Sequence, residues 1–136
     1  MVCTYCGHET DVINSRPQRR TNTVWRRRKC RYCESIVTTT EQVDYEKSWV
    51  VQTSNGTLKP FLRDKLFISL YKSLGHRPTA TTDAIGLTAT IMGQLQKQVE
   101  GGAVTPQLIT KTSHTTLLRF DAAAATTYGA YHKPVL

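Results

Sequence analysis

Three things are missing from this 136-residue chain. No run approaches the ~20 apolar residues that a membrane-spanning helix needs, so we expect no membrane anchor. The start, Met1-Val2-Cys3, carries no apolar signal segment either, so we expect a cytoplasmic protein with reduced cysteines. Acids are also absent from residues 16–31, which hold 8 Lys or Arg.

A recognisable catalytic grouping is missing as well. No Gly-rich phosphate loop of the usual patterns occurs, only 10 acids exist in the whole chain, and His76, His114 and His132 are scattered. All 4 cysteines lie in two Cys-x-x-Cys pairs, which leaves none as a nucleophile if the pairs bind metal. We therefore predict that the protein is not an enzyme.

The cysteine pairs are the strongest positive signal. Two such pairs can enclose one tetrahedral Zn²⁺ and leave no open coordination position, which is typical of a structural zinc ribbon. His8 is a competing ligand, but the sequence favours a four-thiolate site. The predicted zinc ligands are Cys3, Cys6, Cys30 and Cys33.

Positive charge is concentrated just before the second pair. The net charge is +8, and the run Arg26-Arg27-Arg28-Lys29 leads directly into Cys30. In an extended strand, Arg26 and Arg28 would face one side and Arg27 and Lys29 the other. Such a surface favours phosphate-bearing partners, with Trp25 and Tyr32 as stacking groups; a merely solvated basic surface is the alternative.

The chain divides into a predicted ribbon, 1–46, and a second domain, 47–136. Strands are expected at 23–25, 36–40, 49–52 and 58–61, with a tight turn at Asn55-Gly56. Leucines every four residues predict a helix over 62–74, and further helices are expected over 83–99, from Pro106, and over 121–131. The second helix should bury Ile85 and Leu95. The fold class is therefore α+β: a ribbon, then a β-hairpin and three or four helices.

A further group of candidate binding residues lies at the hairpin and the helix that follows it. The turn at Gly56 is followed by Lys59, Phe61, Arg63 and Lys65. A glycine turn with cations near a helix start can hold a nucleotide phosphate, although an exposed helix face needs lysines anyway.

These motifs together resemble a known family. The following segments are similar to the zinc ribbon of NrdR-type transcriptional repressors of ribonucleotide reductase genes: Cys3-x-x-Cys6-Gly7, Val12-Ile13-Asn14-Ser15-Arg16-Pro17, Val24-x-Arg26-Arg27-Arg28-Lys29-Cys30-x-x-Cys33 and Thr38-Thr39-x-Glu41. The next segments resemble the ATP-cone that follows the ribbon in that family: Val50-Val51, Asn55-Gly56, Pro60-Phe61, Lys65-Leu66 and Arg77-Pro78.

The resemblance implies a repressor that senses ATP or dATP, forms a homo-oligomer and binds double-stranded DNA. The DNA contacts that it implies are Arg16, Arg26, Arg27 and Arg28. The nucleotide-site residues that it implies are Gly56, Phe61, Lys65 and Arg77, and Lys59 is added as a replacement cation.

The chain departs from the family in the cone. Thr53 stands where the family has a lysine, Lys59 where it has an acid, and Leu62 where it has an acid or amide. Nucleotide sensing is thus either kept, with Lys59 as the cation, or lost. Two other functions stay open: a nucleotide-sensing regulatory subunit that docks on an enzyme, and an RNA-binding zinc-ribbon protein.

Overall fold

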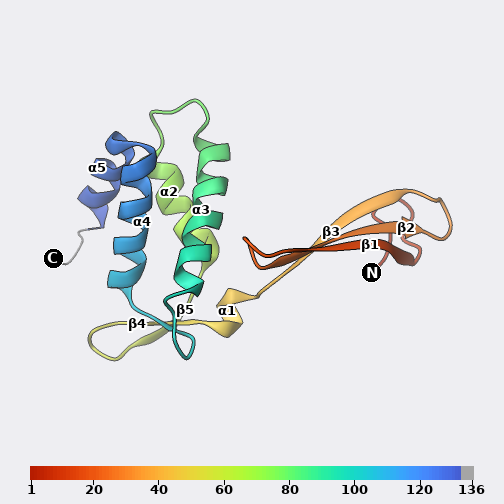
Figure 1. Cartoon of the computed structure of the whole chain (residues 1–136), viewed down its shortest axis with the longest axis horizontal. Coiled ribbons are helices and arrows are strands. Elements are labelled where there is room, and N and C mark those ends of the chain that lie inside the picture. The colour runs from red at the N-terminus through yellow and green to blue at the C-terminus, as the bar shows by residue number, and fades with distance from the viewer. Residues whose placement is uncertain (133–136) are drawn as a thin grey trace. The chain divides into compact units, whose positions relative to one another are not determined.

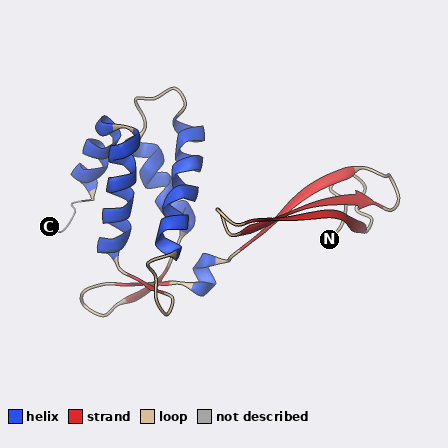
Figure 2. Ribbon diagram, in the orientation of Figure 1, coloured by secondary structure: helices blue, strands red, loops and turns tan. Residues whose placement is uncertain are grey.

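A computed structural model describes residues 1–132. The chain separates into two compact units, one from Met1 to Val43 and one from Asp44 onward. The sequence had placed the division three residues later, after residue 46. Figure 1 shows the strands of the first unit and the helices of the second, and Figure 2 marks the same elements by type.

The first unit is an antiparallel three-stranded sheet. Its strands are β1 (Thr10–Gln18), β2 (Thr23–Cys30) and β3 (Ile36–Gln42), in the order β1-β2-β3. Both expected strands are present, and each extends further than predicted. The whole basic run therefore lies in the central strand, which pairs with β1 on one side and with β3 on the other.

A β-bulge interrupts β1. Val12 pairs with Arg28 and Asn14 pairs with Arg27, so Ile13 is an extra residue on β1. A single extra residue shifts the alternation of side chains between the two faces. Beyond the bulge, Ser15 lies opposite Arg26, and Arg16 lies opposite Trp25.

Up to residue 132, the second unit contains a small sheet and five helices. In chain order they are α1 (Tyr45–Ser48), β4 (Val50–Gln52), β5 (Leu58–Pro60), α2 (Arg63–Ser73), α3 (Ala80–Gln96), β6 (Ala103–Val104), α4 (Pro106–Phe120) and α5 (Ala122–Tyr131). The sheet has the order β5-β4-β6, with β6 parallel to β4. The hairpin was predicted, but the two-residue strand β6 was missed because it is too short to show a pattern.

Glycine at position 102 makes the pairing of β6 possible. Its φ is +73°, and its carbonyl accepts a hydrogen bond from the Val50 N–H at 2.9 Å. A Cβ added there would lie 2.9 Å from the carbonyl oxygen of Ser48. Only glycine meets both the backbone angle and the close approach.

The core of the second unit lies between the helices. Leu70, Ile91, Leu95 and Leu117 are fully buried. Helix α3 begins and ends three residues earlier than predicted, and Ile85 is 55% exposed, so the expectation that it is buried is wrong. The buried stripe of α3 runs through Ala84, Leu87, Thr88 and Ile91 and continues through Met92 and Leu95, so the burial of Leu95 was predicted correctly.

Side-chain caps fix two helix starts where the sequence placed them. The Thr105 hydroxyl accepts a hydrogen bond from the Leu108 N–H at 3.2 Å, and the Asp121 carboxylate accepts one from the Ala124 N–H at 3.0 Å. These caps satisfy N–H groups that have no partner within the helix.

The fold class is confirmed: a four-cysteine ribbon precedes an α+β unit with a β-hairpin and several helices. Among residues 1–132, no helix combines the length and the hydropathy needed to cross a bilayer.

Candidate metal centre and nucleic-acid interface

The two cysteine pairs form turns of the same shape. The Cys3 N–H donates to the His8 carbonyl at 2.7 Å, and the Cys30 N–H donates to the Ser35 carbonyl at 3.0 Å, each across five residues. The residue after each pair has positive φ, +75° at Gly7 and +61° at Glu34. Backbone N–H groups of Tyr5 and Tyr32 point at the first sulfur of their pair, each at 3.4 Å. The backbone thus prepares both turns for negatively charged sulfur.

The turns bring all four thiols together. Their Sγ atoms lie within 4.8 Å of one another, although Cys6 and Cys30 are 24 residues apart. Cys3 Sγ lies 3.7 Å from Cys33 Sγ, and Cys6 Sγ lies 3.4 Å from Cys30 Sγ. A zinc ion with bonds of ~2.3 Å holds its tetrahedral sulfurs about 3.8 Å apart. The cluster therefore has the size that one Zn²⁺ requires, and all four predicted ligands are in it.

The thiols lie close together, and the pKa values of Cys6 and Cys33 are shifted in opposite directions. Hydrogen bonds from the side chain and backbone of Ser35 lower the pKa of Cys33 to about 6. The His8 backbone N–H lowers the pKa of Cys6, but burial and the neighbouring thiols outweigh it and raise that pKa to about 12. Thiolates this close repel one another, and a divalent cation removes the conflict because each coordinated thiol loses its proton.

His8 supports the cluster from outside. Its Nδ1 lies 3.3 Å from Cys6 Sγ, and its ring stacks on Tyr32 at 4.2 Å between centroids. It thus joins the two turns and is not part of the four-sulfur group.

The register of the sheet divides the predicted DNA contacts between two faces. Arg27 lies opposite Asn14 and Thr38, and Arg16 lies opposite Trp25. Opposed residues share a face, so one face carries Asn14, Arg16, Trp25 and Arg27; we name it the Arg16–Arg27 face. Both arginines are exposed, and neither has an ion-pair partner within residues 1–132.

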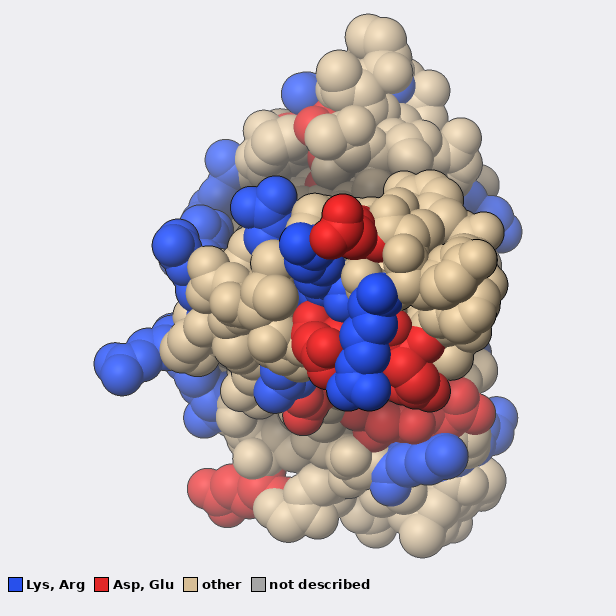
Figure 3. Space-filling model, turned by 90° about the vertical axis from the view of Figure 1, so that its right-hand side faces the viewer, with Lys and Arg blue, Asp and Glu red and all other residues tan. Residues whose placement is uncertain are grey.

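The other two arginines lie on the opposite face and are engaged there. Arg26 forms an ion pair with Glu41, and Arg28 Nε donates to the Thr39 hydroxyl at 3.4 Å. Both are half-buried. Further carboxylates neutralise the edges of the sheet: Asp11 binds Arg31 at 2.7 Å and Glu34 lies 3.6 Å from Lys29. Figure 3 shows blue basic side chains and red acidic side chains next to one another in the view that it gives.

The second unit has a cavity of about 430 Å³ between the hairpin and helices α2, α4 and α5. Its lining residues are Val51, Thr53, Lys59, Pro60, Phe61, Leu62, Lys65, Leu66, Ser69, Pro106, Ile109, Thr110, Tyr128 and His132. Of the five predicted nucleotide-site residues, Lys59, Phe61 and Lys65 line it. The sequence missed Tyr128 and His132, although their i, i+4 spacing on an alanine-rich helix was a usable signal. Burial and the nearby charge of Lys65 lower the pKa of His132.

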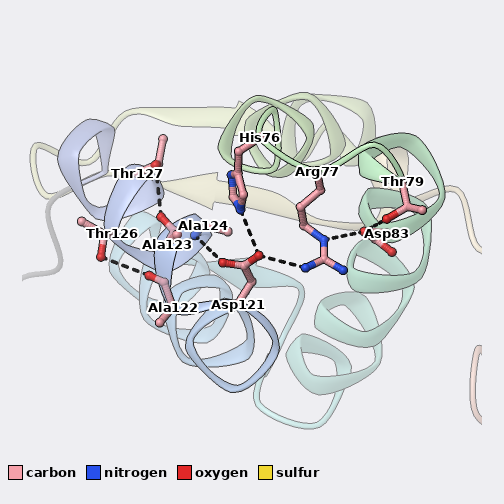
Figure 4. A network of polar contacts seen from close by, with 10 residues as sticks. All are labelled: His76, Arg77, Thr79, Asp83, Asp121, Ala122, Ala123, Ala124, Thr126 and Thr127. Atoms are coloured by element: carbon pink, nitrogen blue, oxygen red, sulfur yellow. Dashed lines mark hydrogen bonds and ion pairs between the residues drawn. The ribbon is translucent and has the colours of Figure 1, made fainter.

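Gly56 and Arg77 do not line this cavity. Gly56 lies in the hairpin turn, where φ is +82°. Arg77 Nε donates to Asp83 at 2.8 Å, and its Nη1 donates to Asp121 at 3.0 Å (Figure 4). The Arg77 guanidinium also lies 4.7 Å from the centre of the Phe120 ring.

Asp121 is the centre of this polar network. In Figure 4 it lies between His76 and Arg77, and its Oδ2 is 2.9 Å from His76 Nε2. The Ala124 N–H, His76 and Arg77 hold the pKa of its carboxyl well below the usual range. The network joins the α2–α3 loop to the start of α5, and so sets the position of the helix that carries Tyr128 and His132.

The fold and the thiol cluster define a class of protein: a four-cysteine zinc ribbon joined to an α+β unit. Residues 1–41 match the family model described as "Transcriptional repressor NrdR-like, N-terminal domain". The ribbon of this chain is therefore similar to that of the NrdR-like transcriptional repressors, as its motifs indicated.

Individual proteins named transcriptional repressor NrdR are also similar to this chain. The transcriptional repressor NrdR of Phenylobacterium zucineum (strain HLK1) is 38% identical over 101 residues, which cover 74% of this chain and 64% of that protein. NrdR of Streptococcus sanguinis (strain SK36) is 37% identical over 84 residues, 61% of this chain and 53% of that protein. NrdR of Streptococcus pneumoniae (strain Hungary19A-6) is 34% identical over 102 residues, which cover 74% of this chain and 62% of that protein. The chain thus spans between half and two thirds of these relatives' length.

Proposed function

We propose that this protein is a zinc-dependent, nucleotide-responsive DNA-binding transcriptional repressor, acting on ribonucleotide reductase genes. One observation carries the proposal: the Arg16–Arg27 face spans β1 and β2, and β2 ends at the four-thiol cluster, in a segment that matches the NrdR ribbon. The matched relatives are named transcriptional repressors.

In this proposal Cys3, Cys6, Cys30 and Cys33 hold one Zn²⁺, which supplies no chemistry beyond fixing the two turns. Because Cys30 is the last residue of β2, the metal also fixes the end of the basic strand. The backbone that carries Arg16 and Arg27 is then already ordered, so it loses little conformational freedom when they contact the duplex. A guanidinium can bind a phosphate or the O6 and N7 atoms of guanine through two parallel hydrogen bonds.

The second unit has the role of nucleotide response and self-association. ATP or dATP would occupy the cavity beside Lys59 and Lys65, and a homo-oligomer would place several ribbons on paired sites. Linked ribbons bind the second site at a raised effective concentration, so a modest single contact is enough.

A direct test uses the zinc-loaded chain in fluorescence anisotropy with duplex DNA from the promoter of a ribonucleotide reductase gene. We expect binding to this duplex to exceed binding to scrambled duplex and to single-stranded RNA, and to disappear when zinc is removed. Sizing in the presence of ATP and of dATP should show a change of oligomeric state.

Each rival function predicts a different result in these experiments. Preference for single-stranded RNA would support the RNA-binding ribbon. Tight nucleotide binding with weak, salt-insensitive attachment to DNA would support the regulatory subunit. A metal-free chain that folds fully and still binds DNA would overturn the zinc-dependent proposal.

A further inference from the structure

The charge of the cavity in the second unit is one-sided. Lys59 lies on its β5 side and Lys65 on its α2 side, and His132 belongs to the same lining. None of the lining residues in the described part of the chain is an aspartate or a glutamate. The nearest acid in sequence, Asp64, is on the first turn of α2 but does not line the cavity.

Both lysines are available to a ligand. Their side chains are exposed, and within residues 1–132 neither takes part in an ion pair. Leu62, the N-cap of α2, provides no side-chain hydrogen bond to the first turn, and it lines the cavity next to Lys65. Uncapped N–H groups at a helix start add a partial positive charge at the same place.

The rest of the wall is apolar. Phe61 and Tyr128 are each only 2% exposed, and Ile109 and Pro106 lie on the α4 side. A volume of about 430 Å³ is within the range of sites that hold small organic ligands. The cavity therefore suits a molecule with a flat apolar part and a strongly negative part.

We propose that this cavity binds a nucleoside phosphate without a divalent cation, with Lys59 and Lys65 as the counter-charges of the phosphate. This rests on the proposed nucleotide response of the second unit, and it specifies the form of the ligand. Mg²⁺ in nucleotide sites is held by carboxylates together with the phosphates. Here no carboxylate lines the described part of the cavity. The two lysine ammonium groups neutralise the phosphate and repel a metal cation.

Calorimetry on the zinc-loaded full chain tests this, with ATP, dATP and AMP titrated in buffer without Mg²⁺ and again with millimolar Mg²⁺. Zinc is retained in both series because no chelator is used. We expect binding without Mg²⁺, and an affinity several-fold weaker when Mg²⁺ occupies the phosphates. Inorganic triphosphate should bind more weakly than ATP because it lacks the apolar part.

Three variants locate the effect. Lys59→Glu should weaken binding without Mg²⁺ by tenfold or more, and should reduce or reverse the Mg²⁺ effect, because a carboxylate now lies beside the phosphate. Lys65→Gln should weaken binding without changing the sign of the Mg²⁺ effect. Lys72→Gln is the matched control, since Lys72 is an exposed lysine on the same helix that does not line the cavity.

Binding that requires Mg²⁺, an unchanged affinity in Lys59→Glu, or an absence of nucleotide binding by the natural chain would each overturn the proposal. Anisotropy with duplex DNA on the same preparation separates this outcome from failure of the repressor function. A chain that binds duplex and no nucleotide loses only this inference, whereas one that binds nucleotide and no duplex loses the DNA-binding proposal.

Discussion

The division of the four arginines between two faces of the ribbon leads to a sharp prediction. Replacing Arg16 and Arg27 together by alanine removes two exposed cations from one face. Replacing Arg26 and Arg28 removes two from the other, where Glu41 and Thr39 already engage them. The two double variants have the same net charge, so any difference in DNA affinity reports which face meets the duplex.

The magnitude follows from counterion release. Each phosphate contact contributes about 0.9 to the slope of log K against log salt concentration. If Arg16 and Arg27 each contact one phosphate, their loss should reduce the slope by about 1.8, whereas loss of Arg26 and Arg28 should change it by much less. If Arg27 reads a base instead, its replacement should cost ~1–3 kcal/mol of discrimination at one base pair.

Fluorescence anisotropy at several salt concentrations, with a cognate and a scrambled duplex, measures both quantities. Zinc content and circular dichroism establish that the variants are folded. Equal slopes for the two double variants, or a larger loss in Arg26→Ala/Arg28→Ala, would refute the assignment of the Arg16–Arg27 face to DNA.

Four further outcomes are expected. Removal of zinc, or Cys30→Ser, should unfold the ribbon while leaving the far-ultraviolet helix signal of the second unit nearly unchanged. Glu34→Gly should stabilise the zinc-loaded ribbon in urea by up to about 1 kcal/mol, because only glycine adopts φ of +61° without strain, and the exposed ion pair with Lys29 contributes little. Gly102→Ala should lower the melting temperature of the second unit more than Gly101→Ala, whose added Cβ would meet nothing within 4 Å. The pKa of Asp121 is lowered in the folded chain, so its carboxylate stabilises the fold above the unfolded pKa near 4. This stabilisation should be lost as the pH falls from that value toward the lowered folded pKa. The melting temperature of Asp121→Asn should change less over the same pH range.

The metal centre and the longer helices were predictable from the sequence because they depend on short-range signals, whereas β1, α1 and β6 were not predicted. Spacing alone identified Cys3 and Cys30 as members of one cluster, and caps at Thr105 and Asp121 marked helix starts. Such signals act within a few residues, so tertiary structure does not overrule them.

What the sequence could not provide depends on pairing between distant segments. The two-residue strand β6 exists only because β4 lies beside it. Arg77 forms an ion network with Asp83 and Asp121 because the α2–α3 loop lies close to the α4–α5 junction, and the sequence does not reveal that closeness. The faces of the basic strand were predicted correctly relative to one another, but their partners Glu41 and Asn14 come from neighbouring strands.

The bulge at Ile13 has a consequence for comparing this ribbon with others. Counting by twos from Asp11, which lies opposite Lys29, would put Arg16 with Arg26, and only the extra residue returns it to the side of Arg27. A deletion of Ile13 would make the ladder regular and leave Arg16 opposite Trp25, because counting by twos from Asp11 then reaches Asn14 and Arg16 directly. A ribbon that is one residue shorter between the first cysteine pair and this arginine can therefore present the same face to an operator, with a regular strand in place of the bulged one.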